Sequence, residues 1–125
     1  MSLKFDTFAA VNAARCVSKH GFDHKLEAWS ASDWMVAILG ELGEAANIIK
    51  KLNRCRDGIR GNKETKAELQ AKLRKELGDV FVYLDLTCQV HGFTIEEAAV
   101  EVWDAKSAEL DYPIRLAKRA KGKKK

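Results

Sequence analysis

Two short acidic motifs in this sequence are nearly identical, and both fall within strongly helical segments. They read Glu-Leu-Gly-Glu at residues 41–44 and Glu-Leu-Gly-Asp at residues 76–79. Residues three apart in an α-helix are separated by about 60° around its axis, so each motif presents two carboxylates on one side. The leucine of each motif belongs to an apolar stripe, which places the acids beside packed surface, where unpaired negative charge is costly. The four acids are Glu41, Glu44, Glu76 and Asp79.

This set of carboxylates favours a hard divalent cation. Mg²⁺ prefers oxygen ligands and is typically held by carboxylates together with substrate phosphates. Gly40, Gly43 and Gly78 each cost a helix interior about 1 kcal/mol relative to alanine, and the missing side chains let a second helix or a ligand approach the acids. The motifs therefore predict a site for a metal and a phosphorylated substrate. The alternative is a solvated helix face, which is what a single Glu-x-x-Glu motif usually is.

Basic, amide and aromatic residues continue the same two helix faces. Cations one to three turns from the acids can bind phosphate oxygens, and an aromatic ring can stack on a base. Structural alternatives remain, since a tryptophan is often a core anchor and cations near a helix C-terminus are favourable in themselves. The candidate substrate-binding residues on these faces are Trp34, Asn47, Lys51, Arg54 and Tyr83.

Four helices are expected to position these residues. The first spans about residues 6–20, with Asp6 as N-cap and Gly21 as the C-terminal stop. The second begins at a capping box at residues 30–33 and ends near residue 54. The third follows a turn at residues 56–62 and ends at His91-Gly92, and the fourth runs from a capping box at 94–97 toward Pro113. The expected core positions of the two central helices are Trp34, Ile38, Leu42, Ala45, Ile49 and Leu52, and Leu69, Leu73, Leu77, Val80, Leu84 and Cys88.

Composition predicts one domain with a basic tail. The chain has 125 residues, 46% hydrophobic and 32% charged, with a net charge of +4. Residues 115–125 hold seven of the 22 basic residues and no acid, so residues 1–114 carry a net charge of −3. We therefore expect a single domain over 1–114, a frayed tail over 115–125, and no nucleic-acid binding except weakly through the tail. Apolar runs are too short for a membrane span, and three scattered cysteines fit a cytoplasmic protein.

At the acidic motifs the chain resembles the MazG-like all-α nucleoside triphosphate pyrophosphohydrolases, whose pattern is Glu-x-x-Glu followed by Glu-x-x-Asp. The similarity covers about residues 30–116. It implies an all-α, four-helix MazG-like bundle completed by oligomerisation, as a homodimer or a homotetramer. It also implies hydrolysis of a nucleoside triphosphate to the monophosphate and pyrophosphate, with Mg²⁺, or Mn²⁺ in its place, held by Glu41, Glu44, Glu76 and Asp79. Glu41 or Glu44 is then the expected catalytic base.

The resemblance adds residues of the fourth helix to the candidate site. Asp104 stands where relatives often have asparagine, and Lys106 is expected to neutralise phosphate charge together with Lys51 and Arg54. Tyr83 is similar in position to a substrate-contacting residue of the family. Because an acid in place of an amide changes the contacts to phosphate or base, the preferred base and sugar stay open.

A different class of function is also compatible with the sequence. The chain can be read as a non-catalytic helical interaction module whose basic tail contacts nucleic acid. That interpretation predicts salt-sensitive binding that is lost when residues 115–125 are deleted and that survives Glu41→Gln. The enzyme interpretation predicts the opposite result for both changes.

Overall fold

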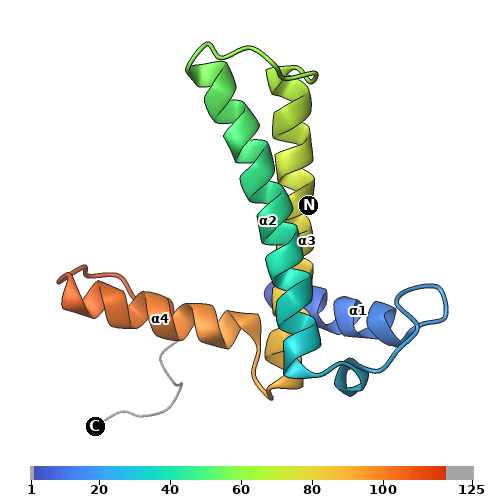
Figure 1. Cartoon of the computed structure of the whole chain (residues 1–125). Helices are drawn as coiled ribbons and strands as arrows, with labels where there is room; N and C mark the ends of the chain where they lie inside the picture. The colour runs from blue at the N-terminus through green and yellow to red at the C-terminus, as the bar shows by residue number, and fades with distance from the viewer. Residues whose placement is uncertain (1, 118–125) are drawn as a thin grey trace, which may run out of the picture.

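Two long antiparallel helices form the centre of the protein. The computed structural model describes residues 2–117. α2 (Ala31–Arg56) rises from the base of the molecule and α3 (Lys66–Val90) returns beside it, so that the two form a long hairpin (Figure 1). The pairing of α2 with α3 is the most extensive contact between elements in the fold. Both acidic motifs therefore lie on one pair of packed helices.

Two shorter helices lie at the base of this hairpin. α1 (Phe5–Val17) and α4 (Ile95–Glu109) extend from the base in opposite directions in the view of Figure 1. A 3-10 turn, η1 (Leu26–Ala28), lies between α1 and α2. α4 contacts α3 and α1 but, over the described residues, not α2. Every regular element in residues 2–117 is helical, which confirms the predicted all-α class.

Capping boxes begin three of the four helices formed by residues 2–117. Both predicted boxes are present: in that of α2, the Asp33 amide donates to Ser30 Oγ at 3.1 Å while the Ser30 amide donates to Asp33 Oδ2 at 2.8 Å. The box of α4, between Thr94 and Glu97, has two such bonds of 3.0 Å. A third box, between Thr65 and Glu68, begins α3 and was not predicted. Each satisfies amides that a helix N-terminus leaves without intrahelical partners.

The first helix differs from its prediction at both ends. Lys4, not Asp6, is the N-cap residue, and the helix ends at Val17 rather than near residue 20. Ser18 is extended, and the chain then folds back over the last turn of α1, where the Phe22 amide donates to the Arg15 carbonyl at 3.3 Å. Gly21 is needed for this close approach rather than as a helix stop, because a Cβ there would lie 1.8 Å from the Arg15 carbonyl oxygen.

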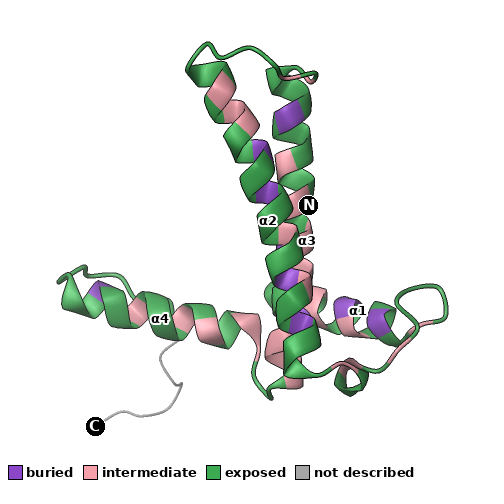
Figure 2. Cartoon of the chain, viewed as in Figure 1, coloured by how far each residue is buried: buried purple, intermediate pink, exposed green. Residues whose placement is uncertain are grey.

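The predicted apolar stripe of α2 covers two different faces. Trp34, Ile38 and Ala45 are buried, whereas Leu42 and Ile49 are 42% and 43% exposed. On α3, Leu69 and Val80 are buried while Leu77 and Leu84 are exposed. Figure 2 shows that the buried residues are few and lie mainly where α2 meets α3 and at the base. One chain thus covers only part of the apolar surface that its helices carry.

A buried polar network attaches α1 to α3. Asp85 is fully buried, and its Oδ2 accepts from Asn12 Nδ2 and from Gln89 Nε2, both at 2.9 Å. The same two amides also donate to backbone carbonyls, Asn12 to that of Val82 and Gln89 to that of Ala9. Because buried amides need partners, this network fixes where α1 lies along α3.

The C-terminal segment is described only as far as residue 117. The amides of Leu116 and Ala117 donate to the Asp104 carboxylate at 2.7 and 3.0 Å, so the first residues of the expected tail return to α4. The rest of that tail, residues 118–125, lies outside the described residues. In the part of the chain that the structure describes, no helix has both the length and the apolar character needed to cross a membrane.

Candidate metal centre

Glu41 and Glu76 occupy positions on the lines of side chains that pack between α2 and α3. On α2 the buried line runs through Trp34, Ile38 and Ala45, and Glu41 falls between the last two at helical spacing. On α3 Glu76 lies in the same way between Leu69 and Val80. Both glutamates are half-buried. A helix pair that placed carboxylates here only for packing would lose stability, because apolar residues would fill the same positions better.

Glu44 completes a cluster of three carboxylates. One oxygen from each of Glu41, Glu44 and Glu76 lies within 4.8 Å of the others. Glu76 Oε2 is buried and has no hydrogen-bond partner. Three carboxylate oxygens lie close together here, and one of them accepts no hydrogen bond. Hard divalent cations bind to oxygen ligands of this kind. The residues therefore fit Mg²⁺ or Mn²⁺.

Mutual repulsion changes the acidity of this cluster. The pKa of Glu76 is raised above its usual value, first by the adjacent Glu41 carboxylate and then by burial. The pKa of Glu44 is raised mainly by the adjacent Glu76. Both shifts mean that the ionised cluster is destabilised when no cation is bound, and that a cation would be bound with a favourable electrostatic energy.

Asp79, the fourth predicted ligand, lies beside this cluster rather than within it. It lines a pocket together with Glu41 and Tyr83, and its charge contributes to the raised pKa values of Glu44, Glu76 and Tyr83. The structure thus brings three of the four predicted carboxylates together and places the fourth next to them.

A pocket of about 390 Å³, here called the aromatic pocket, opens on the Asp79 side of the cluster. The chain that folds back after α1 forms one wall, where the Phe22 ring stacks against Tyr83 with 6.0 Å between ring centroids. The Arg15 guanidinium lies 5.6 Å from the centre of the Phe22 ring, and burial raises the pKa of the Tyr83 hydroxyl. The pocket is lined by Arg15, His20, Gly21, Phe22, Glu41, Asp79, Val82 and Tyr83.

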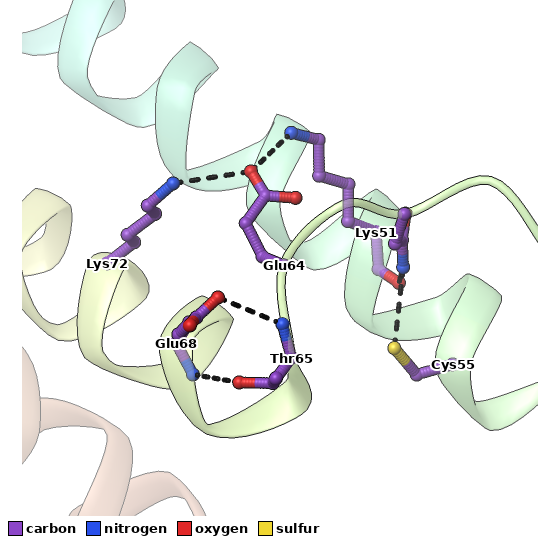
Figure 3. Close-up of polar contacts among 7 residues, drawn as sticks. Lys51, Cys55, Glu64, Thr65, Glu68 and Lys72 are labelled. Atoms are coloured by element: carbon purple, nitrogen blue, oxygen red, sulfur yellow. Dashed lines mark hydrogen bonds and ion pairs between the residues drawn. The ribbon is translucent and has the colours of Figure 1, made fainter.

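A second pocket, here called the lysine pocket, has a volume of about 480 Å³ and opens on the Glu44 side. Lys51 of α2 and Lys72 of α3 reach into it, and both bind one oxygen of Glu64, as Figure 3 shows. These ion pairs lower the pKa of Glu64 to about 2, with Lys51 the largest cause. The pocket is lined by Gly40, Gly43, Glu44, Asn47, Ile48, Lys51, Glu64, Leu69, Lys72 and Glu76. The acidic cluster therefore has the aromatic pocket on one side and the lysine pocket on the other.

Trp34, which we considered as a surface for stacking on a base, is fully buried. Its Nε1 donates to the Leu26 carbonyl at 3.1 Å, and its ring packs on Trp29 with centroids 4.7 Å apart. It also contacts Tyr83, at 6.3 Å between ring centroids. Trp34 therefore packs against the Tyr83 ring in the core, and it does not line the aromatic pocket.

The remaining predicted residues are divided between the site and other parts of the fold. Asn47 and Lys51 line the lysine pocket, whereas Arg54, one turn further along α2, does not. On α4, Asp104 accepts the two backbone amides that lower its pKa, and Lys106 pairs with Glu109. Neither Asp104 nor Lys106 lines a pocket next to the acids, so within one chain the fourth helix does not reach the site.

Several pocket residues, among them Arg15, Phe22 and Glu64, were missed because nothing local in the sequence marks them. Arg15 lies near the acids because α1 packs against α3, and Phe22 because the chain folds back at Gly21, and no helical spacing predicts either contact. Glu64 belongs to the connection between α2 and α3. The only local signal is that it directly precedes the Thr65–Glu68 capping box, which orients its backbone at the start of α3.

Comparison with protein families decides what kind of domain carries this site. Residues 30–107 match the model of the MazG nucleotide pyrophosphohydrolase domain. The chain belongs to this family. The MazG match starts at the N-cap of α2 and ends near the end of α4, so it includes both acidic motifs and confirms the resemblance found in the sequence. Arg15, His20 and Phe22 lie outside the matched segment.

Membership in the MazG family assigns the general activity, hydrolysis of a nucleotide with release of pyrophosphate. No significant match to the chain is found among curated proteins or among solved structures. The finer aspects of function therefore have to be argued from the site itself.

Proposed function

We propose that this protein is a Mg²⁺-dependent pyrophosphohydrolase that converts a nucleoside or deoxynucleoside triphosphate to the monophosphate and pyrophosphate. The observation that carries this proposal is the placement of Glu41 and Glu76 at packing positions between α2 and α3, where Glu76 Oε2 is buried without a donor. A fold gives up stability at such a place where function requires it. Its MazG domain supports the same activity.

Four carboxylates are proposed to hold the cation. Glu41, Glu44 and Glu76 form the cluster, and Asp79 lies beside it on the aromatic side. When bound, Mg²⁺, or Mn²⁺ in its place, would neutralise phosphate charge and lower the pKa of a water. The chain's own contribution is to hold these oxygens on two packed helices, so that little rearrangement is needed during the reaction.

Glu41 and Glu44 are the proposed catalytic bases. Glu44 is exposed at the edge of the lysine pocket, while Glu41 is half-buried and faces the aromatic pocket. A carboxylate of this pair that the metal does not fully engage keeps a lone pair free to accept a proton. Either residue can take the proton of an attacking water at the junction of the two pockets.

The two pockets suggest how a nucleotide would lie across the acids. The aromatic pocket offers Phe22 and Tyr83 for contact with a nucleoside, with Arg15 as a nearby cation. The lysine pocket offers Lys51 and Asn47 for phosphate oxygens. We therefore place the base and sugar in the aromatic pocket and the terminal phosphates in the lysine pocket.

The decisive experiment measures pyrophosphate release from a panel of canonical and modified NTPs and dNTPs, with Mg²⁺ and with EDTA. We expect release that requires the metal and falls at least about a hundredfold in Glu41→Gln. Glu101→Gln makes the same change on the exposed surface of α4 and should keep full activity. Folded wild-type protein that releases pyrophosphate from no nucleotide would refute the proposal.

The interaction-module alternative rests on the basic tail. Residues 118–125 lie outside the described residues, and the pockets and the acidic cluster give this alternative no support. The nucleotide panel separates the two functions, because a non-catalytic module would release no pyrophosphate, and its binding of nucleic acid through the tail would survive Glu41→Gln.

A further inference from the structure

One carboxylate in the lysine pocket binds two cations from facing helices. Lys51 Nζ of α2 and Lys72 Nζ of α3 lie 3.1 and 3.2 Å from the same oxygen, Glu64 Oε1. The Glu64 side chain is only 18% exposed, while those of Lys51 and Lys72 are 30% and 55% exposed. Figure 3 shows Glu64 directed between the two lysines. The pair with Lys51 is the more shielded of the two, and an ion pair shielded from water is screened less than an exposed one.

This arrangement resembles a bound phosphate in its chemistry. Glu64 Oε1 is a single anionic oxygen that accepts hydrogen bonds from two ammonium groups. An oxygen of a terminal phosphate could accept the same two hydrogen bonds in its place. The pocket that holds it is continuous with Glu44 and Glu76 of the acidic cluster. Lys72 is one helical turn from Glu76, so the two cations lie next to the place where phosphates would meet the metal ligands.

The backbone on both sides of Glu64 is held in place. Asn62 Nδ2 donates to the Lys51 carbonyl at 2.7 Å, and the Thr65 amide donates to Glu68 Oε2 at 3.0 Å. With the backbone held by these contacts, moving the Glu64 carboxylate away from the lysines requires only rotation of its own side chain.

We propose that Lys51 and Lys72 form a binding subsite for a pyrophosphate group and that Glu64 is an internal competitor for it. This inference rests on the proposed function and adds to it how the terminal phosphates bind and leave. The incoming phosphates displace the Glu64 carboxylate from both lysines. After cleavage, the return of Glu64 to the lysines favours release of pyrophosphate.

The proposal predicts that removing the Glu64 charge strengthens binding of pyrophosphate. An occupant present about nine-tenths of the time reduces the apparent affinity about tenfold, so Glu64→Gln should bind inorganic pyrophosphate about tenfold more tightly than wild type. Calorimetric titration of the full chain with inorganic pyrophosphate and Mg²⁺ measures this directly. In turnover assays, pyrophosphate should inhibit Glu64→Gln at about tenfold lower concentration.

Three further variants serve as controls. Asp57→Asn removes the same charge close by, from an exposed pair with Arg56 outside the pocket, and should leave the affinity unchanged. Lys72→Gln removes one cation of the subsite and should weaken binding. Glu64→Asp keeps the charge on a shorter side chain and should tighten binding less than Glu64→Gln does. Thermal unfolding of each variant shows whether it is folded.

The outcomes separate this inference from the proposed function. If wild type hydrolyses nucleotides but Glu64→Gln binds pyrophosphate equally or more weakly, the competitor role is wrong and the enzyme remains. A purely structural ion pair gives this result, since its loss would disorder the lysines. If Glu64→Gln binds pyrophosphate more tightly but no nucleotide is hydrolysed, the subsite stands and the proposed activity fails.

Discussion

The carboxylates of Glu41 and Glu76 show, at the scale of single residues, how a site is built at the expense of stability. They occupy packing positions between two helices, and the pKa of Glu76 is raised by Glu41 and by burial. The folded protein therefore binds a proton at Glu76 more strongly than the unfolded chain does. The free energy of unfolding is therefore lowered by this carboxylate at high pH. The loss is absent below the pKa of Glu76 in the unfolded chain and complete above its pKa in the folded protein.

We predict that Glu76→Gln stabilises the metal-free protein at neutral pH while it abolishes turnover. The neutral amide removes repulsion from Glu41 and Glu44, so the melting temperature measured in EDTA should rise. Addition of Mg²⁺ should raise the melting temperature of wild type but not that of Glu76→Gln. A variant that melts below wild type in EDTA would show that the carboxylate contributes to packing instead.

Glu64 has the opposite pH linkage. Its pKa is lowered from 4.5 to about 2 by Lys51, by its own backbone amide and by Lys72, so the folded state releases this proton more readily. The stability that it contributes is fully present above the unfolded pKa and is lost as pH falls from about 4.5 toward 2.

The free energy of unfolding of wild type should therefore exceed that of Glu64→Gln at pH 7, and the difference should shrink between about pH 4.5 and 2. Urea unfolding at several pH values measures both. A difference that does not depend on pH would contradict the ion-paired state, and Asp104→Asn offers a comparison with a carboxylate whose pKa is also lowered, at a site on α4.

At the scale of elements, the aromatic pocket depends on how the chain leaves α1. Gly21 packs so closely on the last turn of this helix that a Cβ would lie 1.8 Å from the Arg15 carbonyl oxygen. Phe22 follows directly and stacks on Tyr83. A glycine outside the MazG match thus controls one wall of the pocket.

We predict that Gly21→Ala lowers the stability by about 1 to 3 kcal/mol and raises the KM for the nucleotide more than it lowers kcat. The backbone has to move, and it carries Phe22 away from Tyr83, while the metal ligands on α2 and α3 stay in place. Lys19→Ala, at an exposed position of the same chain reversal that lines neither pocket, is the control and should leave KM unchanged. If KM for the nucleotide is unchanged in Gly21→Ala, the aromatic pocket does not take part in substrate binding.

At the scale of the whole molecule, a single chain leaves a second apolar stripe uncovered. Met35, Leu39, Leu42 and Ile49 recur at helical spacing along one side of α2, and each is between 42% and 58% exposed. On α4, Val102 is 70% exposed. Contiguous apolar surface of this kind usually marks an interface. The expected homodimer or homotetramer would cover it.

We predict that the protein sediments as a dimer or tetramer and that Leu39→Glu shifts it toward the monomer. A charge on the uncovered stripe would be buried without a partner in the oligomer. Gln70→Glu, at an exposed polar position of α3, should leave the oligomer intact. Sedimentation velocity over a range of concentrations measures the distribution, and a monomeric wild type would contradict the expectation.

The local features of the fold were readable from the sequence because neighbouring residues determine them. Ser30 with Asp33 and Thr94 with Glu97 form their capping boxes as predicted, and the acidic motifs lie on paired helices. A capping box and a repeated Glu-x-x-Glu need only residues within one helical turn, and the unpredicted Thr65–Glu68 box has the same spacing and could have been found in the same way. The family match confirms the resemblance that those motifs carry.

Contacts between distant segments were not readable in this way. The predicted core face of α2 included residues of two adjacent faces, of which only one is buried. Helical spacing alone does not say which of two neighbouring rows of apolar side chains packs against α3. Arg15 joins the site through the packing of α1 on α3, Phe22 through a reversal of the chain, and Glu64 through the pairing of α2 with α3. The sequence thus determined the helices, the acids and the pocket residues on the same helix faces, Lys51 and Tyr83. Arg15, Phe22 and Glu64 depend on long-range packing, whose geometry no local pattern encodes.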